Sequence, residues 1–174
     1  MKAFELAKEI DFHKLSFRIY PPLWEMLDLQ HFGITESDCR EIKYLNDTAD
    51  AFHADINNLP SNSGGIYFFI VKNPKIPFVH SFLLYIGRSR ITSNANLRKR
   101  CKSYFQKHQN ATEERPYITR IFNQWAKFLY IKYICISNND ATESLEKVLI
   151  NSILPPFNNE IPDKRISAAV RAFS

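Results

Sequence analysis

Two apolar segments bounded by glycine or proline constrain the fold of this chain most strongly. The first covers residues 64–71 and the second residues 82–89, and both are rich in β-branched and aromatic side chains. Side chains of these types favour strands, so the two segments predict a β-hairpin with a long spacer at 72–81 that contains Pro74 and Pro77. The chain has four glycines, and glycine allows sharp turns and close backbone approach. Three of them lie in the hairpin segments: Gly64, Gly65 and Gly87.

The residues after the hairpin alternate between helix and strand patterns. Asn96 is a good N-cap for a helix whose apolar face contains Leu97, Cys101, Tyr104 and Phe105. A second helix is predicted over 116–127, a strand over 128–136, and a third helix over 140–154 before two prolines. These elements predict an α/β fold, with a three-stranded, mainly antiparallel sheet flanked by helices.

The first 60 residues carry short helical patterns and no strand pattern. Helices are predicted near 3–9, 22–29, 36–45 and 47–56, and turn-forming residues gather at 57–63. We therefore expect two parts, a helical N-terminal appendage at 1–60 and a second domain at 61–174. The histidines of the appendage lack metal-ligand spacing, and we interpret them as surface or packing residues: His13, His31 and His53.

The composition argues against a membrane-spanning, secreted or disulfide-bonded protein. No run of 18 or more apolar residues is present, so no membrane-spanning helix is expected. The N-terminal residues lack an apolar signal region. The three cysteines, Cys39, Cys101 and Cys135, are widely separated, which argues against both a disulfide framework and a zinc site. A reduced, cytoplasmic protein is the expectation.

The net charge of +5 is unevenly distributed along the chain. Residues 1–63 contain 6 Lys/Arg against 11 Asp/Glu, whereas residues 88–132 contain 11 Lys/Arg against 2 Asp/Glu. A basic block of this kind is typical of proteins that bind a polyanion through its phosphates. A solvated charged surface is the alternative, but the many aromatic residues favour nucleic acid.

Five motifs occur in a fixed order within residues 64–159. They are Gly65-Ile66-Tyr67, Tyr85-Ile86-Gly87, Arg100 at the end of a basic helix start, Glu146 in an apolar helix, and Asn158 in Pro-Phe-Asn. In this order and structural context the chain resembles the GIY-YIG nuclease family. The last two motifs are similar to the N-terminal nuclease domain of the bacterial excision-repair endonuclease.

The resemblance implies a divalent-metal-dependent DNA endonuclease that hydrolyses phosphodiester bonds. It implies a single Mg²⁺ (or Mn²⁺) on Glu146, because Glu146 is the one acid that matches a site position, and a two-metal site needs several carboxylates. Tyr67 and Tyr85 would hold or deprotonate the attacking water, with Tyr67 favoured as the general base. Arg88 and Arg100 would face the phosphate. Asn158 would orient groups near the site.

Several alternatives stay open from the sequence alone. Arg100 could be a surface charge with a packed stem, and Glu143 is interpreted as half of a capping box with Asp140. The chain could be a non-cleaving DNA-binding module, and a nuclease could serve restriction, repair or a mobile element. Residues 1–60 could pack on the second domain, form a homodimer, or bind another protein. The residues expected to bind DNA are Arg88, Arg90, Arg98, Lys99 and Lys102.

Overall fold

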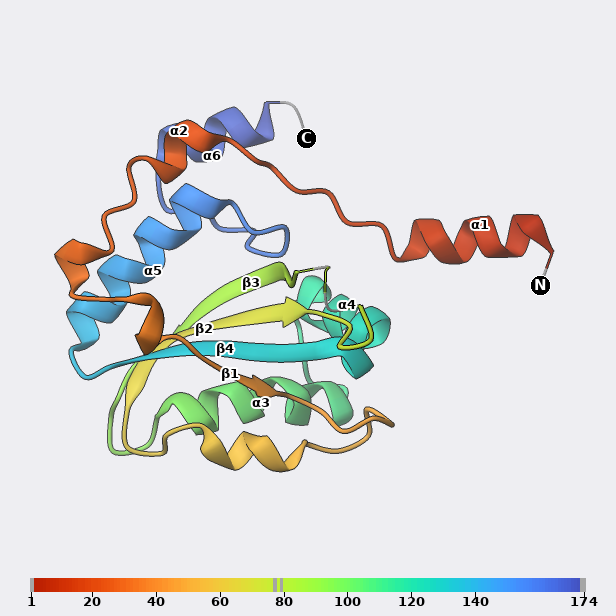
Figure 1. Cartoon of the computed structure of the whole chain (residues 1–174), viewed down its shortest axis with the longest axis horizontal. Coiled ribbons are helices and arrows are strands. Elements are labelled where there is room, and N and C mark those ends of the chain that lie inside the picture. The colour runs from red at the N-terminus through yellow and green to blue at the C-terminus, as the bar shows by residue number, and fades with distance from the viewer. Residues whose placement is uncertain (1, 77, 79, 173–174) are drawn as a thin grey trace.

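The predicted hairpin forms one side of the sheet (Figure 1). A computed structural model describes residues 2–76, 78 and 80–172. In it β2 (Gly64–Val71) and β3 (Phe82–Ser89) pair antiparallel, and β4 (Leu129–Ile136) pairs antiparallel with the other side of β2. The three predicted strands are thus confirmed. Pro77, in the predicted spacer, lies outside the described residues.

A fourth strand, which the sequence did not predict, completes the sheet. β1 (Arg40–Lys43) pairs antiparallel with β4, and the strand order is β1-β4-β2-β3. The expectation of three strands is therefore wrong, and so is the helix predicted over 36–45. Only Ile42 in β1 is buried, so this short strand has no visible apolar alternation.

The residues after β1 also differ from the prediction. The helix expected over 47–56 is wrong, because a turn there leads into a short 3₁₀ helix at Ala54–Asn58. Four apolar side chains around this segment are at most 3% exposed: Tyr44, Leu45, Ile56 and Leu59. Residues 40–59 thus add both a strand and core packing to the sheet. The division of the chain at residue 60 stays a prediction.

Three helices follow the hairpin and β4 as the sequence predicted. They are α3 (Leu97–Gln109), α4 (Pro116–Trp125) and α5 (Asn139–Ile153). Asn96 caps α3 as expected, since its side chain accepts a hydrogen bond from the backbone N–H of Lys99 at 2.9 Å. The cap of α5 is Asn138, whose side chain accepts from two backbone N–H groups of the first turn. The capping box expected at Asp140 and Glu143 is therefore wrong.

Helices cover both faces of the sheet (Figure 1). Apolar residues of α3, α4 and β4 pack with Tyr67 and Phe69 of β2 in one cluster. Leu145, Leu149 and Ile150 of α5 pack with Ile66 and Ile86 in a second cluster. Neighbouring residues of β2 therefore supply opposite faces, as the two-residue period of a strand requires. A side chain on β3 faces either α3 or α5 by the same rule.

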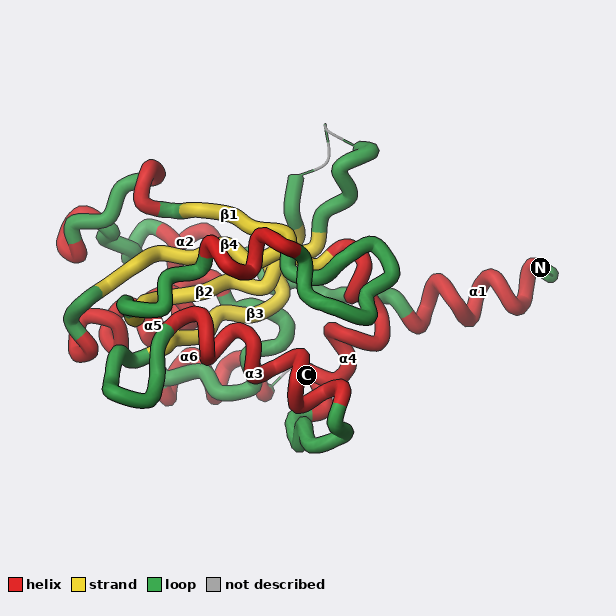
Figure 2. Tube along the Cα trace, turned by 90° about the horizontal axis from the view of Figure 1, so that it is seen from below, coloured by secondary structure: helices red, strands yellow, loops and turns green. Residues whose placement is uncertain are grey.

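The two ends of the chain lie outside the sheet. α1 (Ala3–Phe12) has no buried residue and projects away from the body (Figure 1, Figure 2). α2 (Pro21–Trp24) is shorter than predicted, and the first predicted helix is confirmed by α1. α6 (Lys164–Arg171) has no buried residue and was not predicted. Within the described parts of the chain, no helix is long and apolar enough to cross a bilayer.

Candidate active site

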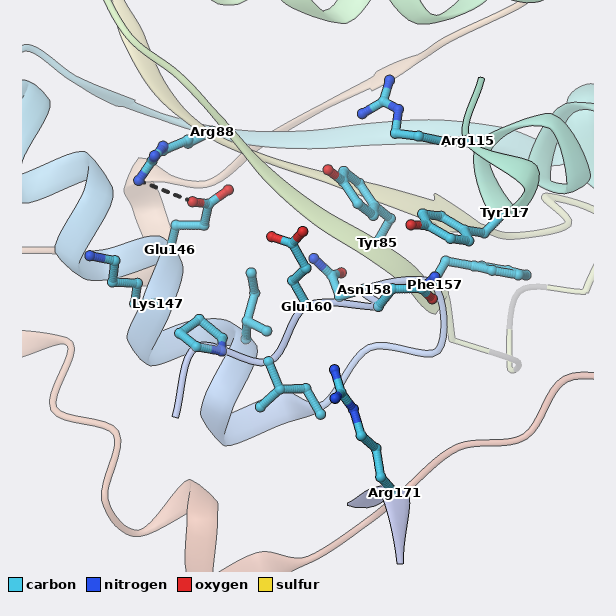
Figure 3. Close-up of a pocket in the computed structure, with 14 residues that line it drawn as sticks. Tyr85, Arg88, Arg115, Tyr117, Glu146, Lys147, Phe157, Asn158, Glu160 and Arg171 are labelled. Atoms are coloured by element: carbon cyan, nitrogen blue, oxygen red, sulfur yellow. Dashed lines mark ion pairs between the residues drawn. The ribbon is translucent and has the colours of Figure 1, made fainter. Parts of the chain in front are cut away.

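A cavity of about 580 Å³ lies at the outer edge of β3 and gathers four of the predicted site residues (Figure 3). Tyr85 and Arg88 come from β3, Glu146 from α5, and Asn158 from the segment after α5. Tyr85 and Arg88 are three residues apart on a regular strand, so their side chains leave opposite faces. Both line the same cavity because β3 is an edge strand and the cavity spans its free edge.

Tyr67 lies behind this cavity and does not line it. β2 is a central strand, and the side chain of Tyr67 is completely buried. Its ring fits over Gly87, the residue directly opposite on β3. A Cβ atom at Gly87 would lie 2.4 Å from the Tyr67 hydroxyl oxygen, so only glycine leaves room for the ring. The two glycine-tyrosine triplets are thus complementary parts of one packing arrangement.

A cluster of tyrosines and arginines connects Tyr67 to the cavity. The hydroxyl oxygens of Tyr67 and Tyr104 are 2.5 Å apart, and Nε of Arg100 donates to the Tyr67 hydroxyl at 3.4 Å. The guanidinium of Arg100 lies 5.0 Å from the centre of the Tyr104 ring. Burial raises the pKa of both Tyr67 and Tyr85, while Arg100 opposes the shift. Arg100 therefore contacts the tyrosine cluster and is more than a solvated surface charge.

Glu146 is the most chemically distinctive group in the cavity. Its side chain is 18% exposed, and its carboxylate lies 3.3 Å from Nη1 of Arg88. Burial raises the pKa of Glu146, and the charge of Arg88 opposes this shift. Arg88 offsets only part of the hydration that the ionised Glu146 carboxylate loses on burial, so a further cation beside it would be favourable. No cluster of three or more His, Cys, Asp or Glu suited to a metal occurs among the residues that the structure describes.

Glu143 organises the cations beside Glu146. Its carboxylate pairs with Arg90 at 2.6 Å, Lys147 at 2.9 Å and Arg88 at 3.1 Å. Hydrogen bonds from Lys147 and Arg90 lower the pKa of Glu143 to about 2. The residue interpreted as a helix cap therefore holds Arg88 in place from the second turn of α5.

Asn158 uses its whole amide group on the backbone of β3. Its Oδ1 accepts from the N–H of Ile86 at 2.8 Å, and its Nδ2 donates to the C=O of Ile86 at 2.8 Å. The N–H of Phe157 also donates to the C=O of Leu84 at 3.0 Å. These bonds cover part of the free edge of β3 and fix the strand on both sides of Tyr85. Asn158 is therefore placed to hold Tyr85 in position.

Most residues of the predicted DNA-binding set have structural partners outside the cavity. Arg98 donates to the C=O groups of Leu59 and Asn57 at 2.6 and 2.7 Å, so it ties α3 to the preceding loop. The ammonium of Lys102 lies 5.2 Å from the centre of the Phe52 ring, Lys99 is exposed, and Arg90 pairs with Glu143. Of the five, only Arg88 lines the cavity.

The cavity also contains charged and aromatic residues that the sequence analysis did not identify. Figure 3 shows Glu160 directed toward the same space as Glu146, with Tyr117 beside Tyr85. Lys147 and Glu160 lie within two residues of motif positions, whereas the others are more distant from the motifs in sequence and reach the cavity only through folding. The additional residues are Arg115, Tyr117, Lys147, Glu160 and Arg171.

Comparisons with known proteins give one set of relatives. UvrABC system protein C of Wolinella succinogenes is 29% identical over 110 residues, or 63% of this chain and 16% of the relative. The proteins of the same name from Helicobacter acinonychis and Christiangramia forsetii are each 31% identical, over 64% and 66% of this chain and 17% and 16% of their own lengths. The chain thus spans about a sixth of these relatives. No family model and no solved structure matches it.

Proposed function

We propose that this protein is a divalent-metal-dependent DNA endonuclease of the GIY-YIG type. The observation that carries the proposal is the convergence of Tyr85, Arg88 and Glu146 on one cavity at the edge of β3. Tyr85 and Arg88 come from β3 and Glu146 comes from α5, which places them 58 to 61 positions apart in the sequence. The similarity to UvrABC system protein C and the basic block at residues 88–132 support the same reading.

Glu146 is the proposed ligand of a single Mg²⁺ or Mn²⁺. Mg²⁺ takes oxygen ligands, keeps several waters, and is commonly bound by only one or two protein carboxylates. The cavity fits this requirement, because Glu146 faces it with a partly buried carboxylate and Glu160 lines it as well. When bound, the ion would supply positive charge against the phosphate and lower the pKa of a bound water. Arg88 pairs with Glu143 as well as with Glu146, so it is held beside the proposed metal ligand and can also meet the phosphate.

Tyr85 is the proposed acceptor of the proton from the attacking water. Its side chain lines the cavity, whereas Tyr67 is completely buried and bonded to Tyr104. We therefore assign the role of general base to Tyr85 and not to Tyr67. The pKa of Tyr85 is raised by burial, so proton transfer needs the charges of Arg115, Arg100 and the metal ion close by.

The remaining site residues act by binding or positioning. Arg88 donates to the non-bridging phosphate oxygens, for which a guanidinium is well shaped. Glu143 holds Arg88, Asn158 holds Tyr85 through Ile86, and Arg100 supports the tyrosine cluster. Tyr85 acts in this step as the phenolate, after losing its own proton to solvent. As the water attacks phosphorus, the phenolate takes one proton from the water, the opposite P–O bond breaks, and the leaving oxygen gains a proton from solvent.

Incubation with supercoiled plasmid tests this function directly. We expect nicked and linear products with Mg²⁺ or Mn²⁺, and intact plasmid with EDTA. A non-cleaving DNA-binding module would retard the plasmid on a gel under both conditions and leave it uncut. Sequencing the ends produced from random DNA would then separate a site-specific restriction role from structure-directed repair or mobile-element roles.

A further inference from the structure

Two arginines mark opposite ends of the cavity, and neither belongs to the predicted DNA-binding set. Arg115 immediately precedes α4, and Arg171 is the last residue of α6. Figure 3 shows them on opposite sides of the cavity, with Tyr85, Asn158 and Glu160 between them. A guanidinium binds phosphate oxygens through two parallel N–H groups. The cavity therefore has a candidate phosphate ligand at each end.

Arg115 is fixed in its position by two kinds of contact. Its Nε and Nη2 donate to the two carboxylate oxygens of Glu113 at 2.7 and 2.9 Å. Its guanidinium also lies 4.7 Å from the centre of the Tyr104 ring. The side chain of Glu113 is only 3% exposed, whereas that of Arg115 is 32% exposed. The carboxylate is thus used to orient the arginine, and the arginine remains accessible.

The cavity continues along the outer edge of β3 toward α6. A second cavity of about 280 Å³ shares Arg171 and three residues of the 158–161 segment with the first. The first cavity is within the range of about 300–1,000 Å³ that holds a small organic molecule, so it can hold one nucleotide-sized group. Together the two adjoining cavities are longer than one phosphate group requires, so they have room for neighbouring nucleotides as well. Both cavities exclude the outward-facing cations of α3.

We propose that the phosphodiester backbone of DNA runs along the outer edge of β3, from Arg115 to Arg171. In this arrangement each arginine binds one phosphate flanking the phosphate held at Tyr85 and Glu146. The proposal rests on the proposed function and adds to it the path of the DNA strand. It also assigns binding to the ends of α4 and α6 in place of the exposed face of α3.

The salt dependence of DNA binding tests this path. Each phosphate contact contributes about 0.9 to the slope of log K against log salt for duplex DNA. Binding of a short labelled duplex would be measured by fluorescence anisotropy in EDTA, so that no cleavage is needed. Arg171→Met is compared with the wild type, and Glu113→Gln/Arg115→Met is compared with Glu113→Gln. The second pair avoids leaving the buried Glu113 carboxylate without its partner.

We expect Arg171→Met and the double variant each to have a slope shallower than its parent by about 0.9. Glu113→Gln keeps Arg115 and serves as the parent against which the double variant is measured. Lys127→Met removes an equal charge from an exposed residue that lines neither cavity, and it should keep the wild-type slope. A parental slope in either arginine variant, or an equal loss in Lys127→Met, overturns the path. Arg171 is exposed on a helix end, so its variant stays informative if the double variant fails to fold.

Plasmid cleavage by the wild type with Mg²⁺ is followed in parallel. If the wild type cuts DNA but the arginine slopes do not change, the path is wrong and the proposed function stands. If the slopes change but no cleavage occurs, the path stands and the nuclease function is wrong. A chain that does not bind DNA at all rejects both.

Discussion

At the residue scale, the structure separates the buried Tyr67, which the family resemblance favoured as the general base, from Tyr85, which lines the cavity. Tyr85→Phe is expected to lower the single-turnover cleavage rate by roughly 10²-fold or more, as the loss of a general base does. Tyr67→Phe should lower it much less, because the Tyr67 hydroxyl is buried against Tyr104 and Arg100. It should instead cost about 1 kcal/mol of stability, the typical net value of one hydrogen bond. Single-turnover cleavage rates, measured with saturating enzyme, distinguish the two roles. If Tyr67→Phe cuts DNA more slowly than Tyr85→Phe, the general base is Tyr67.

The raised pKa of Glu146 has a consequence for stability that can be measured without DNA. A carboxyl group whose pKa is raised by folding stabilises the fold while it is protonated. That contribution is present below the ordinary pKa of 4.5 and is lost as the pH rises through the raised value. Ionised Glu146 therefore destabilises the protein at neutral pH, as expected of a site residue kept for function.

Glu146→Gln should accordingly raise the melting temperature relative to the wild type at pH 7, and raise it less at pH 4. The amide imitates the neutral carboxyl, so the two proteins differ least where Glu146 is protonated. Thermal denaturation at pH 4, 5, 6 and 7 gives the comparison. A gain that is largest at pH 4 would mean that the ionised carboxylate is well compensated in the apo protein.

Four of the residues that the sequence analysis singled out line one cavity, but the position of Tyr67 was not predictable. The four are Tyr85, Arg88, Glu146 and Asn158. The position of Tyr67 depends on the strand order, which places β2 in the centre of the sheet and β3 at its edge. Strand order depends on pairing between segments that are distant in sequence, so local patterns in a single sequence do not predict it.

At the element scale, β1 shows the same limit. Its partner β4 lies about 90 residues further along the chain, and the pairing of Arg40 with Tyr133 leaves no local pattern. The hairpin strands and α3 were predictable because their apolar periodicity and their cap lie within the element itself. α6 was missed although the sequence holds a signal for it, because Asp163 caps its first turn by accepting from the backbone N–H groups of Arg165 and Ile166.

Two truncations test how the N-terminal residues contribute. Removing residues 1–14 deletes α1, which has no buried residue, and should leave the melting temperature nearly unchanged. Removing residues 1–60 deletes β1 with its buried Ile42 and four further buried side chains: Tyr44, Leu45, Ile56 and Leu59. Large-to-small changes at such sites cost about 2–5 kcal/mol each, against a total stability of about 5–15 kcal/mol.

The fragment 61–174 is therefore expected to be unfolded. Circular dichroism and thermal denaturation of both truncated proteins provide the measurement. If fragment 61–174 melts cooperatively at the temperature of the full chain, residues 40–59 are dispensable for the fold. If removal of residues 1–14 unfolds the protein, the contacts of Arg120 and Gln124 with the end of α1 matter more than its exposure indicates.

At the scale of the whole molecule, cations from several parts of the chain gather at the cavity beside the free edge of β3. Arg88 lies on β3, Arg115 precedes α4, and Lys147 and Arg171 lie on α5 and α6, so four separate elements direct cations to one cavity. The sequence analysis assigned DNA binding to Arg88 and Arg90 and to three cations of α3, and it did not identify Arg115 or Arg171. The cations of α3 are adjacent in sequence and were easy to recognise, whereas those of the cavity converge only in the folded chain.

The central claim is that this cavity hydrolyses DNA with a metal ion held by Glu146. Single-turnover cleavage by the wild type and by Glu146→Gln, measured across a Mg²⁺ titration, tests it most directly. The account predicts saturable Mg²⁺-dependent cleavage by the wild type, and a rate at least about 100-fold lower in the variant, in line with loss of a major transition-state charge interaction. DNA binding in EDTA should be retained by the variant. A Glu146→Gln protein that cuts at the wild-type rate with the wild-type Mg²⁺ dependence would contradict the account.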